Sequence, residues 1–309
     1  MDLRWLETFV MVADQGSLVG AARRLDVSPP SVTRAIASLE AHVGVTLFTR
    51  TTRRVKLTPP GERFLVEVRA ILSALDSALG DAAGERETPM GQLSVTASVT
   101  FGRTHVAEVL LDYLHEHPKV SGSLLLLDRV TNLVDEGIDV ALRIGELPDS
   151  SLLARKVGTV RRVLVASPEY LAERGTPRRP EDLAKHDVIA FTGLMQGRKW
   201  RYGEGGKTHE LALNPRLEVN DAWVGLRAAE RGQGITIALS YMIVDALAAG
   251  TLLLVLDEFA PRAIPVQLVI PASRVISAKV RSFLDFAAAR LGARLSAEAA
   301  RLGKANRRS

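Results

Sequence analysis

The chain has 309 residues, of which 47% are hydrophobic and 24% are charged, and its formal net charge at pH 7 is +5. This composition is typical of a globular protein with apolar cores, and the length predicts two or more domains. Cysteine is absent, which excludes disulfides, thiolate metal sites and cysteine nucleophiles. The first residues lack a cationic segment leading into a long apolar one, so we expect no secretory signal and a cytoplasmic location.

Two consecutive helices are predicted near the amino end. The first covers residues 17–25, and the second begins after Ser28, a residue type that caps helix starts, with prolines in its first turn. Gly44 can end the second helix in a left-handed conformation. Apolar residues recur in the second helix at intervals of four, three and four residues, the period of one helix face: Val32, Ile36, Leu39 and Val43.

The opposite face of the second helix carries short polar groups and one long cation. Such a face can enter a DNA groove, where hydroxyls and arginine reach base edges and phosphates. An ordinary solvated helix face is the alternative, because many helix pairs bind no DNA. The predicted DNA contacts of this helix are Ser28, Pro30, Ser31, Thr33 and Arg34.

A basic hairpin is predicted next, with short strands at residues 47–50 and 54–57. Its cations Arg50, Arg53 and Arg54 suit contact with phosphates or the minor groove. From residue 23 to residue 56 there are seven Lys or Arg against two Asp or Glu, an excess of five. A solvated charged loop is the alternative, but a basic hairpin directly after a helix pair favours DNA binding.

A long helix is predicted from the capping residue Thr58 to about residue 85. Its apolar stripe is too long for a small domain to cover, so we expect a partner helix to bury it and form a dimer. The alternative is packing against the chain's own domains. The stripe consists of Phe64, Val68, Ile71, Leu75 and Leu79.

From residue 91 onward, strand and helix patterns alternate, which predicts an α/β fold with mainly parallel strands. The apolar run 237–256 is long enough for a membrane span, but Asp245 and Gly250 interrupt it, so we interpret it as strand, helix and strand. The basic residues after residue 296 are expected to form a frayed tail.

Ligands of open parallel sheets bind at the carboxyl ends of strands. Hydroxyls, amides and backbone N–H groups at these ends suit a small polar or anionic effector, although Ser98 and Thr100 can equally be helix caps. The predicted ligand contacts are Ser98, Val99, Thr100, Phe101, Gly145, Thr192, Gly193 and Asn220.

Catalytic signals are poor. His115 and His117 are two residues apart and would point in different directions from a helix. The glycine-rich stretch 203–207 lacks the spacing of a phosphate loop. We therefore expect no catalytic residue, no metal and no cofactor. An enzyme with a fused DNA-binding domain is the alternative function. A solute-binding transport component would need export and would not need residues 1–58.

The ordered run through residues 16–61 resembles the N-terminal domain of LysR-type transcriptional regulators, with its paired alanines, its Val-Ser-Pro turn and its Gly-Val-Thr-Leu-Phe segment. The stretches 139–149, 163–168 and 232–235 resemble the effector domain of the same family. The resemblance therefore covers nearly the whole chain.

This resemblance implies an N-terminal all-α winged helix-turn-helix with a long linker helix, and a C-terminal α/β two-lobed domain like periplasmic solute-binding proteins. It also implies double-stranded DNA and a small-molecule effector as partners, and a homodimer through the linker helices, commonly part of a homotetramer. Many relatives have glutamine where Pro29 stands, so one base contact is expected to be lost, and Pro60 is unusual at the linker start. The implied domains are residues 1–58 (DNA binding), 59–90 (linker helix and hinge), 91–300 (effector domain; lobe I 91–162 and 266–300, lobe II 163–265) and 301–309 (basic tail).

Overall fold

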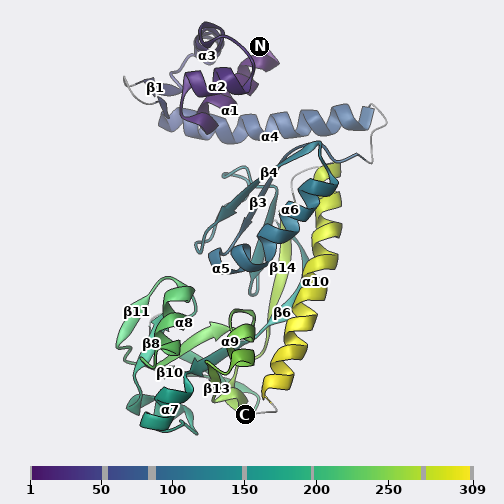
Figure 1. Cartoon of the computed structure of the whole chain (residues 1–309). Helices are drawn as coiled ribbons and strands as arrows, with labels where there is room; N and C mark the ends of the chain where they lie inside the picture. The colour runs from purple at the N-terminus through teal and green to yellow at the C-terminus, as the bar shows by residue number, and fades with distance from the viewer. Residues whose placement is uncertain are drawn as a thin grey trace.

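The structure is a computed structural model that describes residues 2–50, 55–82, 88–147, 152–195, 198–272 and 276–306. A small helical domain at the amino end rests on one long helix, α4, and a larger α/β domain lies on the other side of that helix (Figure 1). The larger part consists of two lobes, each built around a five-stranded sheet.

The N-terminal domain contains α1 (Leu3–Gln15), α2 (Leu18–Arg24), α3 (Pro29–Val43) and a hairpin of β1 (Phe48–Arg50) and β2 (Val55–Leu57). Both predicted serine caps form, since the Oγ of Ser17 accepts from the Gly20 N–H and that of Ser28 from the Ser31 N–H. Gly44 ends α3 in the left-handed region with φ 77°. The predicted helix pair and hairpin are therefore confirmed.

The linker helix α4 (Pro59–Ala82) packs its first half on the N-terminal domain. Val68 is fully buried there, the rings of Phe64 and Phe9 are 5.4 Å apart, and Arg69 forms an ion pair with Asp14 of α1. Ile71, on the same predicted stripe, is 50% exposed. Among the stripe residues whose side chains the structure describes, the N-terminal domain thus buries Val68 and leaves Ile71 half-exposed.

The sheet of lobe I has the order β4-β3-β5-β14-β6. β3 runs parallel to β4 and β5, whereas β14 runs antiparallel to β5 and β6. The helix after β3 contains one π-helical turn, Gly102–Val106. The elements of this lobe are β3 (Gly91–Ala97), α5 (Val99–Phe101), α6 (Ala107–Glu116), β4 (Val120–Leu126), β5 (Val140–Ile144), β6 (Leu152–Val160), β14 (Ile264–Pro271) and α10 (Ala278–Asn306).

The sheet of lobe II has the order β11-β8-β12-β7-β13, and a separate hairpin joins β9 to β10. Its strands are β7 (Arg162–Ala166), β8 (Val188–Phe191), β9 (Lys199–Glu204), β10 (Lys207–Ala212), β11 (Leu217–Val219), β12 (Ile235–Leu239) and β13 (Leu253–Val255). The helices are α7 (Pro168–Arg174), α8 (Ala222–Glu230), α9 (Val244–Ala249) and the 3-10 turns Pro180–Lys185, Ser240–Met242 and Asp257–Phe259.

The prediction of mainly parallel strands is wrong, because each five-stranded sheet contains two parallel and two antiparallel pairings. Apolar alternation reveals a strand but not its direction. Here the chain enters lobe II at β7 and returns to lobe I at β14, and both of these strands pair antiparallel with every neighbour. The glycine-rich stretch 203–207 is the tight turn between β9 and β10, with Gly205 and Gly206 at positive φ.

Strand, helix and strand were predicted for the apolar run 237–256, and the structure places β12, α9 and β13 there. Among the described helices, none is both long and apolar enough to cross a bilayer.

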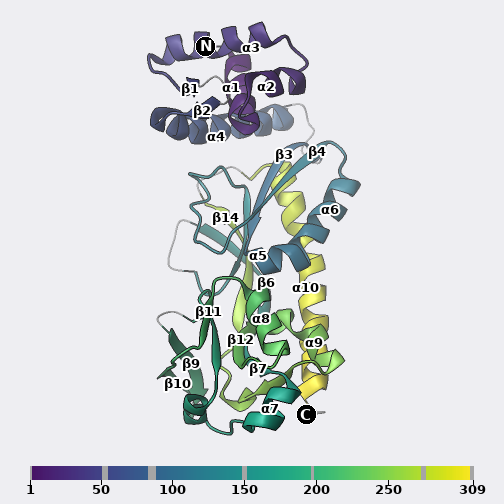
Figure 2. The ribbon, with the colours of Figure 1, turned by 60° about the vertical axis from the view of Figure 1, so that its left-hand side comes forward.

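The prediction of a frayed basic tail is also wrong as far as Asn306, because α10 continues to that residue and runs beside both lobes (Figures 1 and 2). Its last residues, 307–309, lie outside the described residues. Leu291 and Leu295 belong to the core of lobe I, while Leu302 is 5% exposed and belongs to an apolar cluster of lobe II. Arg301 forms an ion pair of 2.8 Å with Asp245 of α9. Leu302 lies seven residues after Leu295, on the same face of α10, and this buried face holds the segment in the helix although Arg301 beside it is exposed.

We expect Leu302→Ala to destabilise the attachment of α10 to lobe II, since truncating a buried leucine costs about 2–5 kcal/mol. Urea unfolding and amide hydrogen exchange over residues 298–306 measure the effect. Leu111→Ala is the control, because Leu111 of α6 is 65% exposed and its truncation should change stability by less than about 0.5 kcal/mol. Equal stability of both variants would contradict the described packing of the tail.

Candidate nucleic-acid interface and effector cleft

The helix α3 lies on the outer surface of the N-terminal domain, and α4 separates it from the effector domain (Figures 1 and 2). Its apolar face is buried through Val32, Ile36 and Leu39. Asp26, in the turn before α3, has φ 53°, a left-handed conformation that aspartate tolerates better than most residues. This turn positions α3 across α2 and leaves its polar face outside.

The predicted contacts on α3 share this outer face, but some of their side chains already form hydrogen bonds within the helix and others do not. Arg34 is exposed and forms no hydrogen bond or ion pair with another described residue, so its guanidinium is available. The hydroxyls of Ser28 and Ser31 are 2.8 Å apart, and the Thr33 hydroxyl donates to the Pro29 carbonyl. These hydroxyls therefore also hold the first turn of the helix, and Pro30 beside them is exposed.

The predicted wing is an antiparallel hairpin in which Arg50 pairs with Val55 and Thr49 with Lys56. The Thr49 hydroxyl donates to the Lys56 carbonyl at 3.2 Å. Arg53 and Arg54, two of the predicted contacts, lie outside the described residues.

Three side-chain hydrogen bonds hold the segment 46–48, which joins α3, the wing and α4. The Glu40 carboxylate accepts from the N–H groups of Leu47 and Phe48 at 2.8 and 3.1 Å. The Thr58 hydroxyl donates to the Thr46 carbonyl at 2.8 Å. A Cβ on Gly61 would lie 2.1 Å from the Leu47 carbonyl oxygen, so only glycine allows this approach. No sequence pattern indicated this role for Glu40, which stands out only as an acid within a basic segment.

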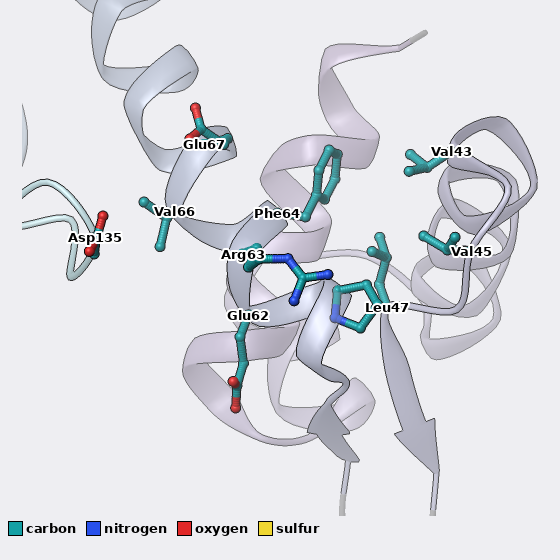
Figure 3. Close-up of a pocket in the computed structure, with 10 residues that line it drawn as sticks. Val43, Val45, Leu47, Glu62, Arg63, Phe64, Val66, Glu67 and Asp135 are labelled. Carbon is teal, nitrogen blue, oxygen red and sulfur yellow. The ribbon is translucent and has the colours of Figure 1, made fainter.

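A hollow of about 760 Å³ lies behind this segment, between the end of α3 and the start of α4. Figure 3 shows Val43 and Val45 on one side of it and Glu67 and Asp135 on the other. Asp135 comes from the loop that follows β4, so the effector domain borders the hollow. This cavity coincides neither with the polar face of α3 nor with the sheet edges where the effector contacts were predicted.

Strand register shows that the two lobes face each other with the carboxyl ends of their parallel strands. In lobe I, the end of β5 pairs near the start of β14, which itself pairs with the end of β6 at Val160. In lobe II, Leu239 at the end of β12 pairs with Arg162 at the start of β7. Both crossings between the lobes therefore lie at these edges, where ligands of such sheets bind.

The residues predicted for the effector lie at these edges, with one exception. Gly145 follows β5, and its N–H donates to the Pro265 carbonyl. Thr192 and Gly193 follow β8, and the Thr192 N–H donates to the carbonyl of Val219. Asn220 comes directly after Val219. Ser98 precedes the α5 helix without a side-chain capping bond, and Val99 and Thr100 are half-buried. Phe101 instead belongs to the core of lobe I.

Two further groups at these edges were missed by the sequence analysis. Asp128 follows β4, and its Oδ1 accepts from the Val99 N–H at 2.9 Å. Tyr241 follows β12 and is 7% exposed, and its hydroxyl has no hydrogen-bond partner among the residues that the structure describes. The rule that named Ser98 and Asn220, applied to the ends of β4 and β12, would have found both residues.

Tyr241 packs against lobe I although it belongs to the chain segment of lobe II. Its ring lies edge-on to Phe101 and His105, at 5.1 and 5.3 Å. Burial raises the pKa of Tyr241 far above its usual value, the charge of Asp128 raises it further, and the Ser98 hydroxyl lowers it. The hydroxyl therefore stays protonated at every physiological pH. His105 in turn has its Nε2 3.0 Å from the Oε1 of Glu298 on α10.

Residues 86–292 match the LysR substrate binding domain, and residues 3–62 match the bacterial regulatory helix-turn-helix of the lysR family. The chain belongs to the LysR family. It is a transcriptional regulator with a DNA-binding helix-turn-helix domain and an effector-binding domain, as the sequence predicted.

Curated LysR relatives align over most of their length. An HTH-type transcriptional repressor of Pseudomonas aeruginosa is 32% identical over 283 residues, which is 91% of this chain and 89% of that protein. The HTH-type transcriptional regulator DmlR of Escherichia coli is 33% identical over 287 residues, 91% of this chain and 92% of that protein.

Solved structures of the same family share the two-part architecture. CrgA, a LysR-type transcriptional regulator from Neisseria meningitidis, aligns with a TM-score of 0.61 and 29% identity over 94% of this chain and 99% of that chain. The Vibrio cholerae virulence activator AphB, in its full-length structure, gives 0.59 and 27% over 93% and 98%. The predicted fold class is thereby confirmed.

We expect Gly61→Ala to destabilise the N-terminal domain by about 1–3 kcal/mol, because the added methyl group would overlap the Leu47 carbonyl. Thermal unfolding of the full chain, followed by fluorescence of Trp5 in that domain, measures the change. Gly303→Ala is the control, since a Cβ there meets no atom within 4 Å and alanine favours the helix. A Gly61→Ala protein as stable as the control would refute the close contact.

Proposed function

We propose that this LysR-family regulator reads its operator with the outer face of α3 and the wing, and that a small-molecule effector binds between the two lobes. The observation that carries the DNA part is the exposed guanidinium of Arg34 on an outward face with no partner in the described chain. The proposed DNA contacts are Ser28, Pro30, Ser31, Thr33, Arg34, Arg50, Arg53 and Arg54.

The effector part is supported by the two facing sheet edges, which bring polar groups of both lobes to the crossings between them. An effector that binds one arrangement of the lobes better than another shifts the protein toward that arrangement. Such a shift alters the spacing of the DNA-binding domains within an oligomer, which couples effector binding to promoter binding. The proposed effector contacts are Ser98, Val99, Thr100, Gly145, Thr192, Gly193 and Asn220, with Phe101 acting through the core behind them.

We further propose a homodimer through the linker helices, assembled into a tetramer that works in the cytoplasm. The half-exposed Ile71 on α4 supports the dimer, because the chain's own N-terminal domain leaves this part of the apolar stripe uncovered. Two DNA-binding domains on one assembly can occupy two half-sites, which multiplies affinity and specificity.

The proposal assigns no catalytic step, cofactor or metal to the chain. Within the described residues, the acidic and histidine side chains form no group of three or more that could hold a metal ion.

Arg34→Ala should weaken binding to an operator selected by the wild-type protein from random-sequence DNA. The expected loss is about 1–3 kcal/mol, with relaxed preference at one position if Arg34 reads a base. A contact to phosphate would instead lower affinity for all sequences and reduce the salt dependence by about one counterion. Fluorescence anisotropy over a range of salt concentrations separates the two results.

The matched control is Arg231→Ala, because Arg231 is an exposed arginine at the end of α8 in lobe II, remote from α3. Operator affinity equal to wild type in the Arg34 variant would overturn the assigned DNA face. Failure of the wild-type protein to retain any duplex in a salt-sensitive manner would overturn the proposed function itself.

A further inference from the structure

The edge of lobe I that faces lobe II holds an internal carboxylate at the start of the α5 helix. The Val99 N–H, which a helix leaves free for an acceptor, donates to the Oδ1 of Asp128 at 2.9 Å. A carboxylate is stable at this position because the helix dipole favours negative charge there. The place where an anionic ligand would bind is therefore already taken by the chain itself.

The ring of Tyr241 lies edge-on to Phe101, two residues after Val99, at 5.1 Å. Asp128 and Ser98 are among the groups that shift the pKa of its hydroxyl. A buried hydroxyl without a partner is unfavourable, so a ligand or water is expected to form a hydrogen bond with it. Ser98, Asp128 and Tyr241, which we term the cleft cluster, come from both lobe segments of the chain.

Asp128 brings a carboxylate to the cleft cluster. The two charged groups that act on Tyr241 are Asp128 and Glu298, and both are carboxylates. The Oε2 of Glu298 is buried without a partner, while its Oε1 bonds His105. Asp128 forms no ion pair with a described residue. An anionic group would meet repulsion here and would have to displace Asp128 from Val99, whereas a cationic donor meets acceptors.

We propose that the cleft cluster is the subsite that receives a protonated amine of the effector. The ammonium donates to the carboxylate of Asp128 and to the hydroxyl oxygens of Ser98 and Tyr241. This inference rests on the proposed function and deepens it, because it replaces the sequence-based expectation of a polar or anionic effector with an amine-bearing one. Charge-assisted hydrogen bonds of this kind are about twice as strong as neutral ones.

Three probes of equal length test the proposal: putrescine, 1,4-butanediol and succinate, which carry ammonium, hydroxyl and carboxylate ends. Each is titrated into the full chain without DNA at constant ionic strength, and thermal unfolding is recorded. We expect putrescine alone to stabilise the wild-type protein. Asp128→Asn, which retains an acceptor for Val99 but loses the charge, should weaken the putrescine effect at least about tenfold in concentration.

The control variant is Glu258→Gln, which removes an exposed acid of lobe II and should leave the putrescine effect unchanged. Tyr241→Phe removes only the hydroxyl and should weaken the effect in part. Stabilisation by succinate, an equal response of Asp128→Asn and wild type, or no response to putrescine would each overturn the amine assignment.

The same proteins are then tested for operator binding, which distinguishes this inference from the proposed function. If succinate, and not putrescine, changes operator affinity, effector control stands and the amine subsite is refuted. If the wild-type protein binds no operator under any condition, the proposed function fails whichever probe stabilises the protein.

Discussion

The contact between Gly61 and the Leu47 carbonyl fixes how closely the linker helix lies against the DNA-binding domain. The wing enters at the same point, where the Glu40 carboxylate binds the amides of Leu47 and Phe48. The helix α3, the wing and the linker helix α4 therefore all contact one short backbone segment. A displacement of the start of α4 would have to move this segment, or break these contacts.

The helices and most strands could be predicted from the sequence because their apolar residues recur with the periods of helix and strand. The direction of β14 could not, since alternation is the same in parallel and antiparallel strands. The end of α10 was mistaken for a tail because its many cations dominate its composition, whereas Leu302 alone reveals the buried face. The composition of this segment is dominated by its cations, whereas its packing on lobe II depends on the buried Leu302.

The candidate sites, like the secondary structure, could be predicted only in part from the sequence. The rule that ligands bind at carboxyl ends of strands led to Ser98 and Asn220, and the structure places both at the facing edges of the lobes. It could not show that Phe101 turns into the core, nor that Asp128 occupies the Val99 amide. Both facts depend on contacts between segments far apart in the sequence, which no local pattern records.

The helix α10 contributes Leu291 and Leu295 to one lobe and Leu302 to the other, within a single unbroken run. Because α10 packs on both lobes, the lobes cannot move far apart unless α10 bends or detaches from one of them. A change in the arrangement of the lobes must therefore either keep Leu291, Leu295 and Leu302 seated on both lobes or bend α10 between them.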